Sequence, residues 1–228
     1  MINSSSVLAI IPARENSKRL KRKNILKFNN KPLLASSIIS AKKSKYIDRL
    51  ILSTESKFIK NIAKKFRCEV PFLRPKHLSK DNISASEVVY YVVKRLKKKY
   101  DIILLLQPTS PLRTIQDIDS AIKFFIKINA KSLVSVSKHP KANKNLVKIN
   151  KKLLIRRTSK NNKNFFFMNG AIYLAKRNFF LKRRKFFHKN ETVAYKMPYS
   201  RSIDIDTEED FNKVIKIFKN ENYSSSRY

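Results

Sequence analysis

Short apolar runs alternate with stretches of helical periodicity along most of this chain. Apolar runs typical of buried strands occupy residues 7–12, 50–53, 69–73, 102–106 and 133–136. Between them, apolar residues recur every three or four positions, as in residues 88–96 and 118–128, which indicates amphipathic helices. This order predicts an α/β fold with a mostly parallel sheet that helices cover on both faces. Ligands bind such sheets beyond the carboxyl ends of the strands, so the loops at those ends are the candidate site.

The length of 228 residues fits a single domain that spans residues 1–228. From about residue 139 to 163 the alternation breaks into short polar pieces, which we interpret as an excursion from the sheet and a dimerisation arm. No apolar run reaches the ~20 residues of a membrane span, and no signal peptide is evident. With one cysteine, Cys68, the chain has no disulfide framework. We therefore expect a cytoplasmic protein with no membrane partner.

The charge balance is extreme, because 52 lysines and arginines against 16 acidic residues give a formal net charge of +36. Basic surfaces bind phosphate backbones without sequence preference, so the charge invites a nucleic-acid interpretation. The basic residues are nevertheless scattered along the whole length, and Gly170 is the only glycine. We favour compositional drift at tolerant surface positions over selected polyanion binding. We also expect asparagine to take the left-handed backbone positions that glycine usually fills.

The loop after the first strand carries the first candidate binding residues. Arg14 follows the strand directly, and Lys23 lies near the end of the same polar, basic loop. An arginine offers a rigid bidentate fork for phosphate, and a lysine adds a mobile point charge. In so lysine-rich a chain, a solvated basic loop is an equally good interpretation.

A second loop, residues 107–113, follows the strand at residues 102–106. Two prolines hold its backbone, and Gln107 at the strand end offers both a carbonyl and an amide group to a polar ligand. A rigid strand-to-helix turn would explain these residues as well. The segment is therefore not specific by itself.

Two carboxylates near the carboxyl terminus form the third candidate. If the isoleucines beside Asp204 point into the core, Asp204 and Asp206 share the opposite face of a strand, ~6.6 Å apart along it. Paired carboxylates suit a hard cation such as Mg²⁺, which takes one or two of them together with substrate phosphates. The alternative is a half-exposed strand that leads into a helix, which explains a capping pair at Thr207 and Asp210 but not the two earlier aspartates.

Taken together, these segments resemble one family. From residue 10 to residue 218, the chain is similar to the CMP-sialic acid synthetases (acylneuraminate cytidylyltransferases), which include the synthetases for legionaminic and pseudaminic acid. The motifs that carry the resemblance are Pro12-Ala13-Arg14, Ser17-Lys18, Lys23-Asn24, Ser53-Thr54-Glu55, Arg74-Pro75, Gln107 to Arg113, Asn169 to Tyr173 and Ser202 to Thr207. They occur in the family's order along the chain.

The resemblance implies a Rossmann-like, nucleotide-binding sheet of the nucleotide-diphospho-sugar transferase type, in a homodimer. It implies transfer of CMP from CTP to an acidic nine-carbon sugar, with release of pyrophosphate and with Mg²⁺ as cofactor. The catalytic residues that it implies are Arg14, Lys23 and Asp206. The implied nucleotide-binding residues are Arg14, Asn24, Arg74, Ser84 and Gln107. The implied sugar-binding residues are Gln107, Asn169 and Gly170, and the implied metal ligands are Asp204 and Asp206.

The first loop departs from the family's pattern at several positions. Glu15-Asn16 replaces a frequent pair of glycines, and Arg19 and Lys21 stand where glycine and proline are common. An asparagine at position 16 still tolerates a left-handed backbone, so we expect the loop to keep its course.

A further departure concerns the carboxylate of the sugar. Phe167 stands where relatives often carry an arginine, two residues before the Asn-Gly pair. An acidic sugar needs a cation for its carboxylate. We expect Lys138, Arg156 or Arg157 to replace the missing arginine.

Two alternatives stay open at this point. Within the same reaction, the acceptor could be legionaminic or pseudaminic acid; the Gln107 and Asn169 motifs favour the sialic and legionaminic branches. From another class, an inactive synthetase scaffold could act as a basic nucleic-acid-binding protein, although we do not expect nucleic acid as the partner. The synthetase for the eight-carbon sugar Kdo fits the motifs poorly.

Overall fold

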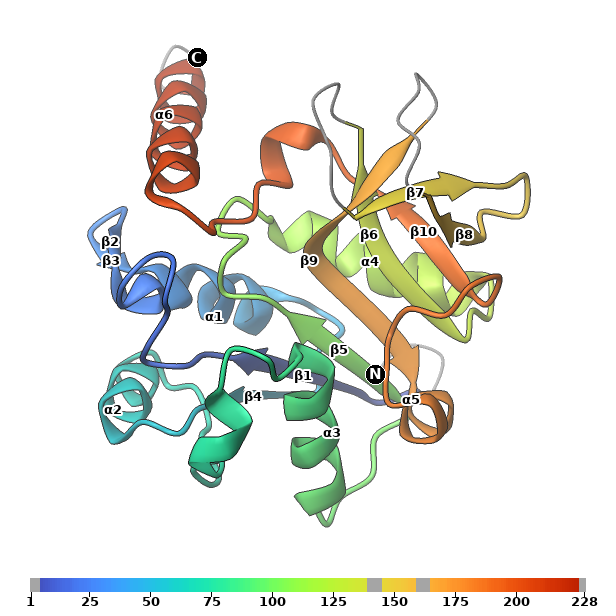
Figure 1. The fold of residues 1–228 in the computed structure, drawn as a ribbon, viewed down its shortest axis with the longest axis horizontal. Helices are drawn as coiled ribbons and strands as arrows, with labels where there is room; N and C mark the ends of the chain where they lie inside the picture. Colours follow the sequence, from blue (N-terminus) through green and yellow to red (C-terminus); the bar gives the residue numbers. More distant parts are fainter. Residues whose placement is uncertain (1–4, 139–144, 159–164, 226–228) are drawn as a thin grey trace.

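A mixed eight-stranded sheet forms the centre of the computed structural model, which describes residues 5–138, 145–158 and 165–225. The main strand order is β10-β6-β9-β5-β1-β4 (Figure 1). The strands are β1 (Val7–Pro12), β2 (Lys27–Phe28), β3 (Lys31–Pro32), β4 (Arg49–Ser53), β5 (Ile102–Leu106), β6 (Ser132–Ser137), β7 (Leu146–Ile149), β8 (Ile155–Arg157), β9 (Phe166–Lys176) and β10 (Thr192–Lys196). The helices are α1 (Leu33–Lys43), α2 (Lys57–Lys65), α3 (Ala85–Arg95), α4 (Ile115–Lys127), α5 (Arg177–Arg183) and α6 (Glu208–Ser225).

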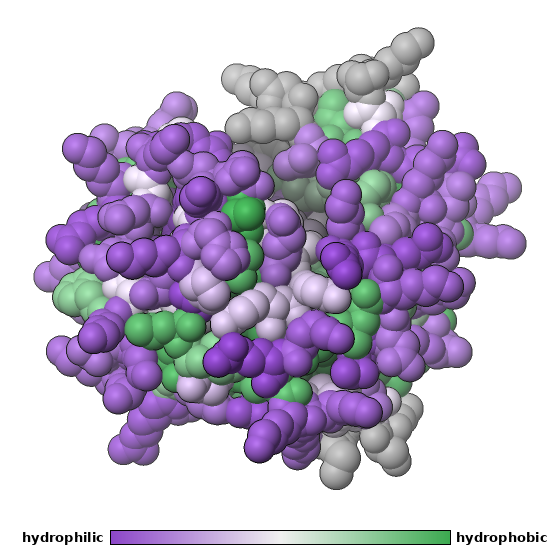
Figure 2. Space-filling view, turned by 60° about the horizontal axis from the view of Figure 1, so that its bottom comes forward, coloured by the Kyte–Doolittle hydropathy of each residue, from purple (hydrophilic) through white to green (hydrophobic). Residues whose placement is uncertain are grey.

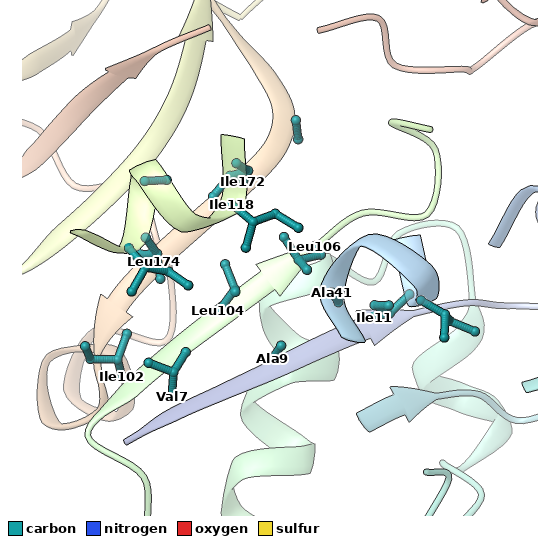
Figure 3. Close-up of a cluster of buried hydrophobic side chains, with 14 of the residues drawn as sticks. Val7, Ala9, Ile11, Ala41, Ile102, Leu104, Leu106, Ile118, Ile172 and Leu174 are labelled. Atoms are coloured by element: carbon teal, nitrogen blue, oxygen red, sulfur yellow. The ribbon is translucent and has the colours of Figure 1, made fainter. Parts of the chain in front are cut away.

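Helices cover both faces of the sheet, as the alternating pattern predicts. Successive side chains of a strand point to opposite faces. In β1, Val7, Ala9 and Ile11 pack in one cluster with residues of α1, α2 and α4 (Figure 3). Leu8 and Ile10 pack in a second cluster, with residues of α3 and α5. The α/β fold class is therefore confirmed.

The strand predictions are mostly confirmed, with one correction. The strand predicted at residues 69–73 is wrong: Glu69 forms an isolated bridge to Ile51, and the pairing goes no further, because Pro71 has no N–H to donate to a ladder. The prediction of a mostly parallel sheet is confirmed. β1 pairs in parallel with β4 and β5, and β10 with β6, but β9 lies between β5 and β6 and is antiparallel to both.

Part of the segment predicted as a dimerisation arm falls outside the described residues, at 139–144 and 159–164. Its described part forms β7 and β8, which pair with each other, while β7 also pairs with β9. Among the described residues, no helix combines the length and the hydrophobicity of a membrane span. Hydrophilic side chains dominate the face shown in Figure 2, in keeping with the high charge of the chain.

The shortage of glycine has a visible structural consequence. Asn29, Asn30, Asn129, Asn145 and Asn190 adopt positive φ, which confirms that asparagine takes positions where glycine is usual. Four residues of other types also adopt positive φ: Arg22, Arg67, Leu153 and Arg184. These four carry a steric cost that asparagine and glycine largely avoid.

The end of α2 shows this cost in a defined motif. The N–H of Cys68 donates to the Ala63 carbonyl at 3.0 Å, and the N–H of Arg67 donates to the Lys64 carbonyl at 2.8 Å. This hydrogen-bond pair is a Schellman motif, whose left-handed residue is usually glycine. Here that residue is Arg67, with φ of 52°.

Glycine in place of Arg67 is expected to raise the free energy of unfolding by about 0.5–1 kcal/mol. An L-residue in the left-handed region costs ~1–2 kcal/mol, of which the greater entropy of glycine in the unfolded chain offsets a part. Urea denaturation of the purified protein measures the change. The control is Asn129→Gly at the same motif after α4, where asparagine already tolerates the conformation and a smaller gain is expected. Equal gains at both positions would contradict the explanation.

Candidate functional site

A cleft opens beyond the carboxyl ends of β1 and β5. Its walls come from the loop after β1, the segment that precedes α3, the loop after β5 and the turn before α6. Six of the predicted site residues line it: Arg14, Lys23, Asn24, Arg74, Gln107 and Asp206. Cationic residues near the amino terminus and a carboxylate near the carboxyl terminus thus meet in one cleft, at the sheet edge where ligands of such folds bind.

Asp206 is held by two cationic side chains. Lys23 Nζ lies 3.1 Å from Asp206 Oδ1, and Arg19 Nη1 lies 2.8 Å from Asp206 Oδ2. Lys23 Nζ also donates to the Ile205 carbonyl at 2.6 Å, so the lysine is fastened at two points. Each oxygen of this carboxylate therefore faces a protein cation.

Arg14 also lines the cleft, next to another carboxylate. Its Nη1 lies 2.6 Å from Asp81 Oδ1 and donates to the Ser79 carbonyl at 3.3 Å. Asn24, which is buried, donates from Nδ2 to the Arg14 carbonyl at 2.8 Å and so fixes the course of the loop. Asn24 Oδ1 is buried and lacks a hydrogen-bond partner among the described residues, which leaves an acceptor for a ligand.

Arg74 lines the cleft, and its guanidinium donates hydrogen bonds to other groups of the protein. Nε donates to Ser79 Oγ at 2.8 Å, Nη1 to the Ser53 carbonyl at 2.9 Å, and Nη2 to Glu55 Oε2 at 3.0 Å. The residue is only 4% exposed. These contacts make Arg74 a brace of the cleft wall that ties the end of β4 to the segment before α3.

Gly170 lies next to a predicted sugar-binding residue, Gln107, and a predicted metal ligand, Asp204. Its φ is +79°, and a Cβ at this position would lie 3.4 Å from Gln107 Nε2 and 3.7 Å from Asp204 Oδ2. Both the backbone conformation and the close approach favour glycine here. Gln107, Gly170 and Asp204 are therefore immediate neighbours beside the cleft.

Asp204 has the features of an incomplete cation ligand. Its Oδ1 atom is buried and has no hydrogen-bond partner among the described residues. Burial raises the pKa of Asp204 to about 6; a hydrogen bond with Thr109 opposes this shift and the nearby Asp206 carboxylate adds to it. A bound cation would compensate the orphaned oxygen, so Asp204 and Asp206 fit a divalent cation. Within the described ranges, no group of three or more acidic, histidine or cysteine side chains could hold a metal, so substrate oxygens would complete the site.

The strand predicted around Asp204 is wrong, but the burial expected of its isoleucines is confirmed. Residues 203–206 belong to no strand, and the N–H of Ile205 donates to the Thr109 carbonyl at 2.9 Å. Ile203 and Ile205 are nonetheless 6% and 0% exposed.

Capping at the start of α6 is confirmed. Asp210 Oδ2 accepts from the backbone N–H of Thr207 at 2.9 Å and from that of Asp206 at 3.0 Å. The cap therefore orients the backbone at Asp206 as well as the helix.

Asn169 and Ser84 have structural partners of their own. The Asn169 side chain accepts from Ser135 Oγ at 2.5 Å and donates to Ser137 Oγ at 2.9 Å, so it anchors the backbone next to Gly170 to β6. Ser84 caps α3 together with Glu87. Ser84 does not line the cleft described above and borders a second cavity instead.

This second cavity, of about 630 Å³, lies next to the cleft. Its lining includes Arg157, Tyr173, Phe186 and Phe187. Ser84 lines this cavity, and its chain neighbours Ile83 and Ala85 line the first cleft, so the two spaces adjoin. Burial raises the pKa of Tyr173 to about 12, and the hydroxyl therefore stays protonated at neutral pH.

The structure separates the three cations considered as replacements for the arginine absent at position 167. Lys138 Nζ lies 5.3 Å from the centre of a ring in β9, and Arg156 Nε donates to Asn190 Oδ1 at 2.7 Å. Neither residue borders the second cavity, whereas Arg157 does, with its guanidinium 5.3 Å from the Phe187 ring centre. Among the described residues, Arg157 forms no ion pair with a carboxylate.

Sequence reasoning assigned no role to three residues that shape the site. Arg19 contacts Asp206, Tyr173 lines the second cavity, and buried Arg113 cross-links the ends of β5 and β9 by donating to the Gln107 and Ala171 carbonyls. Arg113 was visible as the last residue of the 107–113 motif. Its burial depends on contacts across the sheet, which the local sequence does not reveal.

Known proteins are similar to this chain over nearly its whole length. Residues 8–226 match the profile of a family described as Cytidylyltransferase. The chain is 34% identical over 229 residues to a CMP-N,N'-diacetyllegionaminic acid synthase from Legionella pneumophila, covering 93% of this chain and 96% of the relative. It is 32% identical over 226 residues to an N-acylneuraminate cytidylyltransferase from Escherichia coli, covering 96% of this chain and 53% of that protein.

Among solved structures, a CMP:2-keto-3-deoxy-manno-octonic acid synthetase complexed with CTP superposes with a TM-score of 0.80 at 14% identity. The match covers 95% of this chain and 100% of that chain. At this level of identity the likeness concerns the fold. It supports the arrangement of strands and helices described above.

Proposed function

The chain belongs to the cytidylyltransferase family, and we propose on that basis that it transfers CMP from CTP to the anomeric hydroxyl of a sialic-type nonulosonic acid, releasing pyrophosphate. The observation that carries the proposal is the single cleft lined by Arg14, Lys23 and Asp206. Its cations suit a triphosphate, and its carboxylate suits the cation that accompanies one.

In the proposed reaction, the sugar hydroxyl loses its proton to water as its oxygen attacks the α-phosphorus of CTP, and the bond to the bridging oxygen of the leaving pyrophosphate breaks. Negative charge grows on the pyrophosphate as that bond breaks. Arg14 and Lys23 both line the cleft, where fixed positive charge stabilises such a transition state. Asn24 would bind the nucleotide through its free carbonyl oxygen.

The cofactor in this proposal is Mg²⁺, held by Asp204 and Asp206. When bound, it would neutralise phosphate charge and align the reacting groups. The orphaned Oδ1 of Asp204 supports this assignment, because a buried carboxylate oxygen without a partner is costly. Asp206 would contribute once its contacts with the two cations rearrange.

The second cavity is the proposed place of the acceptor sugar. It adjoins the nucleotide cleft at Ser84, and its mixed aromatic and polar lining suits a sugar with an acyl group. Arg157 would bind the carboxylate in place of the arginine that Phe167 replaces. In the proposed homodimer, the arm at about 139–163 of one subunit would close the sugar site of the other.

Glutamine in place of Arg157 is expected to raise the KM for the acid sugar by about tenfold or more, because a hydrogen bond to a charged group contributes ~1.5–3 kcal/mol. The KM for CTP is expected to stay within about twofold, since Arg157 does not line the nucleotide cleft. Steady-state kinetics with each substrate varied in turn measure both values. Arg156→Gln is the matched control on the same strand. Equal effects from the two substitutions would exclude Arg157 as the carboxylate partner.

The experiment that tests the function is formation of a CMP-sugar by purified protein with CTP, Mg²⁺ and one candidate acid at a time. Sialic, legionaminic and pseudaminic acids are compared, with Kdo as the eight-carbon control. Legionaminic acid is the principal competitor, because the Legionella relative is similar over nearly its whole length. Pyrophosphate release with at least one nine-carbon acid is expected, and its absence with all of them would refute the proposal.

A further inference from the structure

Arg19 occupies a position that the proposed reaction does not explain. Its guanidinium lies 2.8 Å from Asp206 Oδ2 while Lys23 takes the other carboxylate oxygen. Both oxygens of a proposed metal ligand are thus engaged by protein cations. A divalent cation at Asp206 would stand beside both of these positive charges, and their repulsion favours the opening of one contact.

The two cations differ in how firmly they are held. The Lys23 side chain is 14% exposed and donates to the Ile205 carbonyl as well as to Asp206. The Arg19 side chain is 66% exposed, and its partner among the described residues is Asp206. An ion pair so exposed to water is weak, so Arg19 is the contact that opens.

After its contact with Asp206 opens, Arg19 would still be placed to bind a triphosphate. It lines the cleft together with Arg14 and Lys23, and its planar fork matches phosphate oxygens. Five basic residues line the cleft, and the Asp206 carboxylate balances part of that charge.

We propose that Arg19 occupies the place of the divalent cation at Asp206. Its guanidinium holds the Asp206 carboxylate before ligands bind, and it moves to the triphosphate when the metal and CTP bind. The inference rests on the proposed function. It means that Arg19 weakens binding of a metal ion alone, strengthens binding of CTP alone, and so favours entry of the two together. Because such coupling is reciprocal, it is measured from either ligand.

The test uses the full-length protein and two probes, Mn²⁺ alone and CTP alone in EDTA. Mn²⁺ binding is followed by electron paramagnetic resonance and CTP binding by isothermal titration calorimetry. With Arg19→Gln, Mn²⁺ is expected to bind about two- to fivefold more tightly, the range that an exposed ion pair contributes. CTP in EDTA is expected to bind at least about tenfold more weakly, as for a lost hydrogen bond to a charged group.

The matched control is Arg22→Gln, which removes the same charge from the same loop. The Arg22 side chain is 61% exposed and lies 3.5 Å from Glu15, away from Asp206, and it does not line the cleft. Its effect on both probes is expected to stay below about twofold. The gain in Mn²⁺ affinity from Arg19→Gln is also expected to vanish in an Asp206→Asn background.

Unchanged Mn²⁺ affinity in Arg19→Gln, or equal changes in the two glutamine variants, would overturn the inference. If the wild-type protein still forms a CMP-sugar in that case, the proposed function stands and only the role of Arg19 falls. If the wild-type protein binds no CTP even with Mn²⁺, both fall together. Circular dichroism of each variant establishes that the fold is retained.

Discussion

Asparagine in place of Asp206 is expected to lower kcat for CMP-sugar formation by at least about 10²-fold while the fold is retained. Cation-assisted charge stabilisation is worth several kcal/mol in phosphate chemistry, and each ~1.4 kcal/mol changes a rate tenfold. The substitution keeps the size of the side chain and removes the negative charge that Lys23 and Arg19 now share. Because Asp206 is 28% exposed, we expect its loss to cost at most about 1 kcal/mol of stability.

The control is Glu208→Gln, which makes the same charge change two residues away, on an exposed position of α6. Its kcat is expected to stay within about twofold of the wild-type value. Turnover is measured by pyrophosphate release, and the fold by thermal denaturation. Near-normal turnover of Asp206→Asn would remove the metal role. A protein without turnover that bound RNA or DNA tightly, with a steep dependence on salt, would instead support the nucleic-acid-binding alternative.

The location of the cleft could be predicted because it follows from topology. Once Val7–Pro12 and Ile102–Leu106 are recognised as neighbouring parallel strands, the loops after them must meet at one edge of the sheet. Arg14 and Gln107 follow those strands directly, so their meeting needs no further information. Asp206 is different: the motif around it suggested its role, and the structure shows how Ile205 attaches the segment to Thr109.

The direction of β9 could not be predicted from its sequence. An apolar run buried on both faces looks the same whether its strand runs parallel or antiparallel to its neighbours. The direction depends on the connection through β7 and β8, and that region lacks a clear periodicity. The strand predicted at 69–73 failed for a local reason, because its apolar residues include a proline.

The functions of individual polar side chains were the least predictable part of the site. The ligand contacts predicted for Arg74 and Asn169 stay predictions, and the structure adds contacts within the protein. Arg74 donates to Glu55 and Ser79, and the Asn169 side chain is hydrogen-bonded to Ser135 and Ser137. Most of these partners lie 19 to 34 residues away in the sequence, while Ser79 is five residues from Arg74. A motif identifies such residues as important without distinguishing a ligand contact from a brace, since both need a polar side chain at the same place.

Arg113 is the brace whose loss is expected to have the largest effect on stability. Its guanidinium is buried and donates to the Ala171 carbonyl at 2.7 Å, the Gln107 carbonyl at 3.2 Å and Ser37 Oγ at 2.7 Å. Burial lowers the pKa of Arg113 to about 10, so the side chain is still charged at neutral pH. Three acceptors from α1, β9 and the end of β5 thus depend on one side chain.

Methionine in place of Arg113 is expected to lower the free energy of unfolding by about 3 kcal/mol. Buried acceptors left without donors cost ~1–3 kcal/mol each, and part of this cost is offset because methionine carries no charge that must be desolvated on folding. Urea denaturation measures the change, and in a thermal scan we expect a fall in Tm of about 6–12 °C. Arg156→Met on exposed β8 is the control, with a change within about 0.5 kcal/mol.

Lysine at position 113 separates charge from geometry. It keeps the positive charge but cannot reach all three acceptors with a planar fork, so we expect an intermediate loss of about 1–2 kcal/mol. Because the Gln107 and Ala171 carbonyls flank the place where Gly170 approaches Gln107, both variants are also expected to weaken CTP or sugar binding before they unfold. A lysine variant as stable as the wild type would show that charge alone matters, and a methionine variant that loses less than about 1 kcal/mol would refute the bracing role.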